Sequence, residues 1–400
     1  MNDHRGQLAL FVLFRLSRSV AAGMITIAFP YLVLTYRHYS PLQLGLLYTS
    51  AAVATAALGL LFGFLTDTWG RVKTLFLVGL LLPVSSAIVF FSSGLLPLFI
   101  ATILGGYSAT GSLMEGGVGG AAQPIQTAVV TSLTSSDDRT FWFSILTFLS
   151  GMFGALGALL AKHADVRNVF LYATLISGSG LVFLVFVRAA EFRGNLRRLH
   201  SKVIIGKFTI TGILNGFTQG LVVPFLIPFF VIVYHVPKSD MAVYAFASGA
   251  LASIALLAAP RLEQTLGFVK SIAVTRGIGT VLLLLLPFWH VYLFALAVYL
   301  VTPALRVMAL PVQRTAFTEM VKPDELGRAL GINQVARLGA SSGGITLTGY
   351  LFNVSEFAAP FCIYAVTMAA NIYLYFRFFY HGHPPSAEKR ENQHHVASFK

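Results

Sequence analysis

The sequence has few charged residues, and few of those are acidic. Only 11% of its 400 residues are charged and 56% are hydrophobic, whereas ordinary soluble domains are about 25% charged. This composition excludes an ordinary soluble domain and indicates an integral membrane protein. Apolar runs near or above the roughly 20 residues needed to cross a bilayer recur along the whole chain. These runs are continuous rather than alternating, so they predict helices and not a barrel.

Cysteine and the common catalytic motifs are nearly absent. Cys362 is the only cysteine, so a disulfide or a cysteine-based metal site cannot form within one chain. The sequence lacks the nucleotide-binding pattern G-x-x-x-x-G-K-[ST], which disfavours an ATP-driven pump. Clustered histidines and acids that would support an enzyme are also missing. We therefore expect neither a cofactor nor a metal, and a protein that is not an enzyme.

Basic residues exceed acids by 28 to 15, which gives a net charge of +13. In a soluble protein this excess would suggest a nucleic-acid partner. Here most of the basic residues lie in alternate connections between apolar runs, and the intervening connections hold only Arg37, Lys162, Arg167 and Lys238. The asymmetry predicts a multi-pass protein of the plasma membrane with both termini in the cytoplasm. Contact with the lipid bilayer is then expected, and nucleic acid is not.

The apolar runs predict twelve membrane helices. Their expected ranges are 8–35, 42–65, 74–93, 95–134, 139–161, 167–188, 203–234, 240–260, 269–288, 290–320, 328–352 and 357–380. The fourth range is too long for one span, and it holds seven glycines between Gly105 and Gly120. Each glycine weakens a helix by about 1 kcal/mol, so the sequence predicts a broken or bulged helix there. A longer external loop is the alternative.

A polar, strongly basic stretch separates the sixth and seventh runs. The expected organisation is an N-terminal six-helix bundle over 1–188 and a basic cytoplasmic linker over 189–206. A C-terminal six-helix bundle over 207–380 and a disordered cytoplasmic tail over 381–400 follow.

The two halves repeat in sequence. The matched segments are Pro30-Tyr31 with Pro228-Phe229, Pro124-Ile125-Gln126 with Pro311-Val312-Gln313, and His38 with His235. A charged stretch between the second and third runs has a degenerate copy in Pro260–Lys270. In that copy Gly267 is kept and Gln264 replaces the acid. The repeat predicts two pseudo-symmetric bundles.

The charged stretch itself reads Gly63-Phe64-Leu65-Thr66-Asp67-Thr68-Trp69-Gly70-Arg71-Val72-Lys73. It resembles G-x-L-x-D-x-x-G-R-x-K, the signature between the second and third helices of the major facilitator superfamily. The resemblance implies a secondary transporter with two six-helix repeats and a substrate site near the membrane midplane. It also implies a cytoplasmic conformational latch, which comprises Gly63, Asp67, Gly70, Arg71 and Lys73. The alternative is a solvated basic loop that merely follows the positive-inside rule.

Ionisable residues inside the spans are functional candidates, because each costs about 2.5–3.5 kcal/mol to insert. Glu115 is the only carboxylate that lies well inside a predicted span and away from a predicted cytoplasmic connection. Apolar surroundings would raise its pKa and suit a proton-coupling role. An ion pair with an arginine, or a place in a solvated loop, is the alternative.

Four arginines inside predicted spans stand out as candidates: Arg15, Arg18, Arg306 and Arg337. Guanidinium groups suit bidentate capture of carboxylate or phosphate, so these residues predict a site for an anionic substrate or an anionic group on a larger one. The alternative is snorkelling, in which Arg15, Arg18 and Arg337 extend their charges to the interface. Arg306, near the middle of the tenth span, has little room to snorkel.

Two pairs of amides lie in the second half. Asn215 and Gln219 are four residues apart in the seventh span, and Asn333 and Gln334 open the eleventh. They are candidates for substrate binding or, equally, for helix-to-helix bonds worth about 0.6 kcal/mol. In the fifth span the glycines of Gly151–Gly157 predict close helix packing.

The leading functional hypothesis is a monomeric secondary transporter that moves a small solute by alternating access. An organic anion is the favoured substrate, and proton coupling is considered. A drug or metabolite efflux antiporter is one alternative, although Ala155 stands where the related antiporter signature usually has proline. A membrane sensor that kept the carrier fold but lost transport is another.

Overall fold

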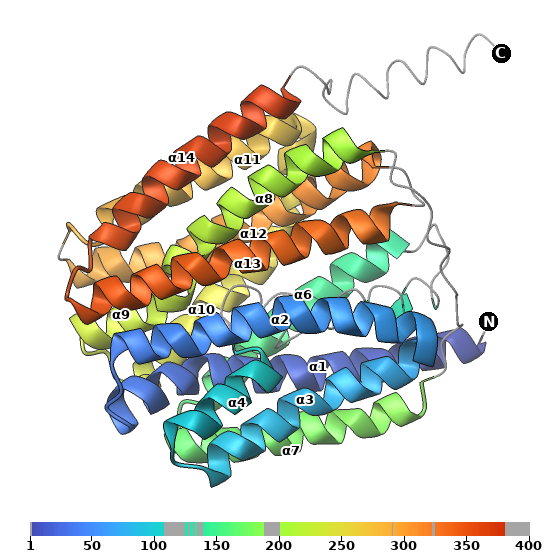
Figure 1. Cartoon of the computed structure of the whole chain (residues 1–400), viewed down its shortest axis with the longest axis horizontal. Coiled ribbons are helices and arrows are strands. Elements are labelled where there is room, and N and C mark those ends of the chain that lie inside the picture. Colours follow the sequence, from blue (N-terminus) through green and yellow to red (C-terminus); the bar gives the residue numbers. More distant parts are fainter. Residues whose placement is uncertain are drawn as a thin grey trace.

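The helices account for most of the chain and run along one common axis (Figure 1). The structure is a computed structural model that describes residues 2–107, 125–126, 129–130, 133, 139–187, 201–289, 291–321 and 325–380. Its helices are α1 (Asn2–Tyr31), η1 (Leu32–Tyr36), α2 (Pro41–Trp69), α3 (Arg71–Phe91), α4 (Leu95–Gly105), α6 (Arg139–Leu160), α7 (Val166–Val185), α8 (Lys202–Val222), η2 (Val223–Phe225), α9 (Leu226–Val233), α10 (Lys238–Ala255), η3 (Leu256–Ala258), α11 (Ala259–Leu285), α12 (Tyr292–Met320), α13 (Leu326–Asn353) and α14 (Ala359–Phe379). Among the described residues, 8 helices are long and apolar enough to cross a membrane.

The helices form two bundles with matching internal packing. In the first, α1 packs against α6 and α7, and α3 packs against α4 and α7. In the second, α8 packs against α13 and α14, and α11 packs against α12 and α14. The main contacts between the bundles are α2 with α13 and α6 with α10. The protein thus has the predicted all-helical membrane fold of two pseudo-symmetric six-helix bundles.

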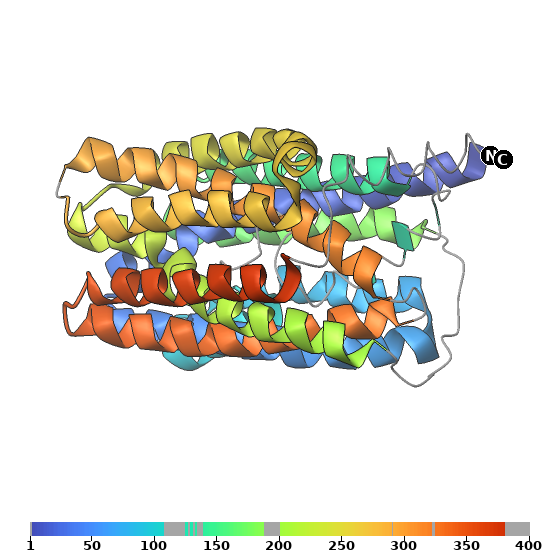
Figure 2. The same ribbon diagram turned by 90° about the horizontal axis from the view of Figure 1, so that it is seen from above.

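The two ends of the molecule are defined by its connections. The terminus end is where α1 begins and α14 ends, and Figures 1 and 2 show both on the same side. The far end is where α1 passes into α2, α9 into α10 and α13 into α14. Figure 1 shows α2 and α13 side by side at the far end and diverging toward the terminus end.

Backbone conformations repeat between the bundles at the positions where the sequence repeats. Gly70 has φ 94° and Gly267 has φ 74°, and both values lie in a region that glycine adopts without steric cost. His38 and His235, at the far end, have φ 54° and 51°. Each pair, Gly70 with Gly267 and His38 with His235, therefore has the same unusual backbone conformation in both bundles. This agreement matches the repeat seen in the sequence.

Three predicted helix boundaries differ from the structure. The charged connection over 66–73 reduces to one residue, because α2 runs to Trp69 and α3 begins at Arg71. The expected connection over 261–268 is helical except at Gly267. The expected seventh span over 203–234 is interrupted by η2, where Pro224 has no N–H to continue the α-helical ladder.

Helix α4 is shorter than the predicted fourth span. Helix α4 ends at Gly105, and Gly106 follows in the left-handed conformation with φ 60° and ψ 43°. The turn folds Tyr107 back onto α3, where its hydroxyl lies 3.0 Å from Ser85 Oγ and 3.2 Å from Ser86 Oγ. The remainder of the glycine-rich segment, with Glu115, lies outside the described residues. The broken or bulged helix therefore stays a prediction, with a longer loop as its alternative.

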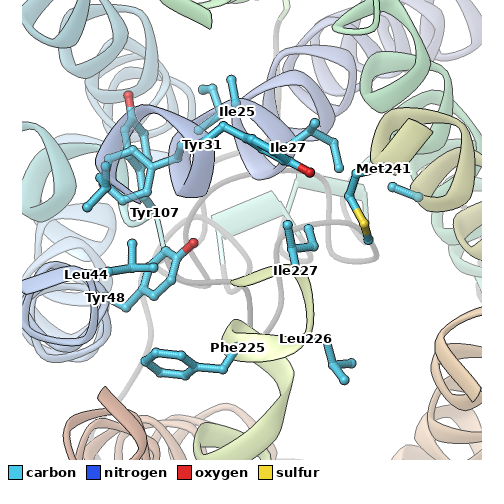
Figure 3. Packing of buried hydrophobic residues seen from close by; sticks show 14 of the residues in the cluster. Ile25, Ile27, Tyr31, Leu44, Tyr48, Tyr107, Phe225, Leu226, Ile227 and Met241 are labelled. Carbon is cyan, nitrogen blue, oxygen red and sulfur yellow. The ribbon is translucent and has the colours of Figure 1, made fainter. Parts of the chain in front are cut away.

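An apolar core joins the two bundles at the far end. It includes Tyr31, Tyr48 and Tyr107 from the first bundle with Phe225 and Met241 from the second. Figure 3 shows these side chains converging between the ribbons, with the Tyr31 hydroxyl directed toward Met241. The rings of Tyr48 and Phe225 meet edge to face with centroids 6.3 Å apart. The contact between the two bundles at the far end therefore buries apolar surface.

Candidate functional site

The described hydrogen bonds between the bundles gather toward the far end. At the α2–α13 seam, the hydroxyls of Thr49 and Thr346 lie 2.8 Å apart, and Thr49 Oγ1 lies 3.3 Å from the Ser342 carbonyl. Nearer the far end the two helices touch through glycine: a Cβ on Gly45 would lie 2.9 Å from Gly349 Cα. These contacts close the far end around the core of Figure 3.

The latch residues lie at the opposite, terminus end. Gly63 and Asp67 belong to the last two turns of α2, and Gly70 separates that helix from Arg71 at the start of α3. Lys73 is exposed on the first turn of α3. The Asp67 side chain lies outside the described part of the structure, so the latch stays a prediction.

Arg18 is buried deep in the first bundle, with a relative exposure of 2%. Its Nη1 donates to the Gly79 carbonyl over 2.8 Å. That carbonyl is available because Pro83, four residues later on α3, has no N–H to bond to it. The guanidinium also lies over the Phe14 ring, 5.6 Å from its centroid. Arg18 thus joins α1 to α3, at the point where Pro83 interrupts the hydrogen bonds of α3, and its buried side chain does not follow the snorkelling alternative.

The other three predicted arginines lie in different surroundings. Arg15 is 8% exposed and donates from Nε to Ser150 Oγ on α6 over 2.7 Å. Arg337 donates to Gln334 Oε1 over 2.8 Å, one turn away on the same face of α13. Arg306 is half-buried at the middle of α12. The described hydrogen bonds of Arg15 and Arg337 thus go to different helices, α6 and α13.

The predicted amides donate one described hydrogen bond between helices and one within a helix. Asn333 donates from Nδ2 to the Phe208 carbonyl over 2.7 Å, which joins α13 to α8. Gln219 donates to Asn215 Oδ1 over 3.1 Å, along α8 itself. Both residues of that pair are buried, with exposures of 1% for Asn215 and 6% for Gln219. Asn333 thus acts in helix packing, while Asn215 and Gln219 form a polar step within one helix.

Arg276 is the polar centre of the second bundle, although it is not among the arginines predicted from the sequence. Arg276 is 6% exposed on α11. Its Nη1 donates to Asn371 Oδ1 over 2.6 Å and its Nη2 to Gln313 Oε1 over 3.1 Å. The guanidinium also lies over the Tyr375 ring, 5.0 Å from its centroid. Asn371 in turn donates to the Thr211 carbonyl over 2.8 Å, so one arginine links α8, α11, α12 and α14. Its position inside the expected 269–288 span was the available signal.

Arg276 and Arg18 occupy related places in the two bundles. Gly79 follows Gly70 by the same number of residues as Arg276 follows Gly267. Arg18 on α1 therefore reaches the α3 position that corresponds to Arg276 on α11. Each bundle buries a guanidinium at this level, and the first bundle supplies it from a different helix than the second.

Arg276 shares an electrostatic neighbour with a second arginine. The hydroxyl of Tyr364, a buried residue of α14, lies within electrostatic reach of both Arg276 and Arg306 and beside the Thr280 side chain. None of the described partners of Arg276 carries a negative charge. We call Arg276, Arg306, Tyr364, Asn371 and Gln313 the arginine centre. It combines two cations with neutral amide and hydroxyl groups, a set that suits an anionic ligand group.

Family comparison agrees with this architecture. A family model described as Major Facilitator Superfamily matches residues 11–306 and, in a second match, 208–400. The comparison with curated proteins found no match.

Solved transporters share the fold at low sequence identity. The nucleoside transporter NupG is 11% identical with a TM-score of 0.73, and the alignment covers 94% of this chain and 100% of that one. The human organic anion transporter MFSD10 (TETRAN) is 13% identical with a TM-score of 0.67, and the coverage is 93% and 99%. The xylose transporter XylE from E. coli, in an inward open conformation, is 15% identical with a TM-score of 0.68, and the coverage is 94% and 96%. At these identities the likeness concerns the fold.

Proposed function

Since the chain belongs to the major facilitator superfamily, we propose that it is a secondary transporter that carries a small solute with an anionic group by alternating access. Both termini lie in the cytoplasm of a cell whose plasma membrane the helices cross, as the basic connections indicate. The far end is then the outer side. The closed far end and the diverging terminus end correspond to an inward-facing state (Figure 1).

The observation that carries the substrate proposal is the arginine centre. Arg276 is buried among neutral partners, and buried charge is costly unless it is paired or hydrogen-bonded. Its two amide partners accept hydrogen bonds but carry no charge, so the positive charge is not compensated by them. Arg306 adds a second cation at the middle of α12. A carboxylate or phosphate on the solute supplies the missing negative charge.

Energy for accumulation comes from an ion or solute gradient. Glu115 is the proposed proton-coupling carboxyl, and the latch around Asp67 closes the terminus end when the far end opens. Further candidates for substrate contact, secondary to the arginine centre, are Arg15, Asn215, Gln219, Gln334 and Arg337, whereas Arg18 and Asn333 bond neighbouring helices.

Arg306→Gln is expected to raise KM for an anionic solute about tenfold, since a hydrogen bond to a charged group contributes about 1.5–3 kcal/mol. A thermal-stabilisation screen of purified protein against small carboxylates, phosphate esters and their neutral or cationic analogues selects the solute. Uptake of that solute into proteoliposomes then gives KM and kcat. Arg306→Lys should recover part of the affinity because it keeps the charge.

The matched control for this experiment is Arg377→Gln. Arg377 is exposed in the last turn of α14, so its loss should leave KM unchanged. An Arg306→Gln protein that folds and transports with the parent KM would remove Arg306 from the site. If the selected solute binds but its flux never exceeds that of empty vesicles under any gradient, the sensor hypothesis replaces transport.

Asp67→Asn is expected to slow transport about fivefold with little change in solute affinity, because a surface acid–base interaction contributes about 1 kcal/mol at most. The loss should weaken closure of the terminus end rather than binding. Rates and affinities are measured in the same proteoliposomes. Glu356→Gln, which removes an exposed acid at the far end, is the control. Equal effects of the two substitutions on rate would contradict the latch.

A further inference from the structure

The second seam between the bundles, α6 with α10, is closed at the far end by a lysine. Lys238 is the first residue of α10, in the second bundle. Its ammonium donates to the carbonyls of Ala161 and Ala164, and it lies 3.4 Å from the carbonyl of Lys162. These three residues directly follow the end of α6, in the first bundle. One side chain thus bonds three carbonyls of the opposite bundle.

The position of Lys238 suits α6 and not its own helix. The end of a helix leaves carbonyls unpaired and carries a partial negative charge, which a cation stabilises. At the start of a helix the same dipole disfavours a cation. Helix α10 begins after Pro237, and the described structure shows no side-chain hydrogen bond capping it. The favourable interaction of Lys238 is therefore the one it makes across the seam.

A reciprocal contact lies next to it. Tyr31, at the end of α1 in the first bundle, donates its hydroxyl to the Val236 carbonyl over 2.6 Å. Val236 lies two residues before Lys238. We call Tyr31, Val236, Lys238, Ala161 and Ala164 the far-end clasp, since each bundle supplies one donor and the other supplies the carbonyls.

The symmetry-related seam is built differently. In the first bundle Ser40 stands near the place of Lys238, just before α2, and it forms a capping box with Gln43 within that helix. The α2–α13 seam then closes through direct backbone contact of Gly45 with Gly349. The α2–α13 seam therefore closes through uncharged contacts, whereas the α6–α10 seam closes through the charged side chain of Lys238.

Other basic residues at the far end cap helices within one bundle. Arg37 donates to the Ser92 carbonyl over 2.7 Å, and Arg167 donates from Nε to the Phe90 carbonyl over 2.9 Å. Both carbonyls belong to the end of α3, in the same bundle as the arginines. Lys238 uses the same chemistry across the seam. Its contact is therefore lost when the bundles part at the far end, whereas those of Arg37 and Arg167 persist.

We propose that Lys238 is a positioning residue that sets the fraction of transporter molecules closed at the far end. It does so because its ammonium caps the end of α6 only in the far-end-closed state. The inference rests on the proposed alternating-access cycle, in which the far end must open. A contact present in one of two states biases the equilibrium by its full differential free energy. Removing the ammonium therefore shifts the equilibrium toward the far-end-open state.

The test measures the distance between the bundles at the far end. Spin labels are attached through His163→Cys and Asn353→Cys in a Cys362→Ser background; His163 and Asn353 are exposed and belong to different bundles. Double electron–electron resonance spectroscopy in nanodiscs, without any solute, then gives the populations of short and long distances between the two labels. Lys238→Gln is expected to raise the ratio of long to short distances about tenfold, the equivalent of about 1.4 kcal/mol.

Three further variants specify the cause. Lys238→Arg should keep the parent ratio because it retains a cation with several donors. Tyr31→Phe should shift the ratio less than Lys238→Gln does, because it removes one uncharged hydroxyl donor. Arg167→Gln removes a helix cap within one bundle and should leave the ratio unchanged.

The outcomes separate the clasp from the proposed function. A parent that shows both distances, with Lys238→Gln at the same ratio, overturns the clasp and leaves alternating access standing. A shift in Arg167→Gln as large as in Lys238→Gln also overturns the clasp, because it would reflect general loss of helix caps. A single unchanged distance in parent and variants, with or without transported solute, overturns both. The expected selective shift supports the clasp even where the anionic substrate proves wrong.

Discussion

Gly157→Ala is expected to destabilise the folded protein by about 3 kcal/mol, the upper range for overpacking, although alanine is the better helix former by about 1 kcal/mol. A Cβ on Gly157 would lie 2.0 Å from the Val20 carbonyl oxygen. The obstacle is backbone, so a side-chain rotation cannot relieve it, and α1 and α6 must separate. The midpoint of thermal unfolding, followed by size-exclusion chromatography in detergent, should fall sharply.

Gly277→Ala is the control for this prediction. A Cβ on Gly277 of α11 meets nothing within 4 Å among the described residues, so the substitution should be neutral or stabilise by up to about 1 kcal/mol through helix propensity. Equal midpoints for Gly157→Ala and the parent would show that α1 and α6 do not approach as closely as described. The comparison isolates helix contact from the general effect of removing a glycine.

The fold could be predicted because its determinants are local or repeated. Long apolar runs require helices in a membrane whatever their packing partners. The repeat then supplied the division into bundles, and paired features such as Gly70 with Gly267 reappear as shared backbone conformations. Close packing was likewise foreseeable at Gly157, since a small residue permits approach wherever the neighbouring helix lies.

Helix boundaries were less accessible to sequence reasoning. Charge and polarity predicted a connection around Gly70, but one glycine with positive φ reverses the chain and leaves Asp67 and Arg71 in helices. The same holds at Gly267, where helix continues on both sides. A polar stretch therefore marks where a span leaves the membrane, not where hydrogen bonding along the backbone stops.

The partners of the buried polar groups could not be inferred from the chain at all. Arg18 depends on a carbonyl made available by Pro83, on another helix. Asn333 bonds backbone on α8, whereas Asn215 bonds the next turn of its own helix. Sequence gives the depth of such a residue but not the rotation of its helix about its axis. Rotation decides whether an amide or guanidinium meets another helix or the solute pathway.

Arg276→Leu is expected to destabilise the second bundle by about 2–5 kcal/mol, because it leaves two amide oxygens, one fully buried and one partly buried, without their donors; such a loss costs about 1–3 kcal/mol for a fully buried group. Those oxygens belong to Asn371, which is fully buried, and to Gln313. Arg276→Lys keeps the charge but has no planar fork to reach both amides, so an intermediate loss is expected. Unfolding midpoints and denaturant titrations in detergent measure the series.

The double variant Arg276→Leu/Asn371→Leu separates a hydrogen-bonded hub from simple crowding. Replacing both partners of a buried hydrogen bond with apolar groups is far less costly than replacing one. The double variant should therefore lose less stability than the two single variants together, with a coupling of about 1 kcal/mol or more. Strict additivity would mean that Arg276 and Asn371 stabilise the bundle independently. A stable double variant that no longer prefers anionic over neutral solutes would, in addition, link the charge of Arg276 to substrate choice.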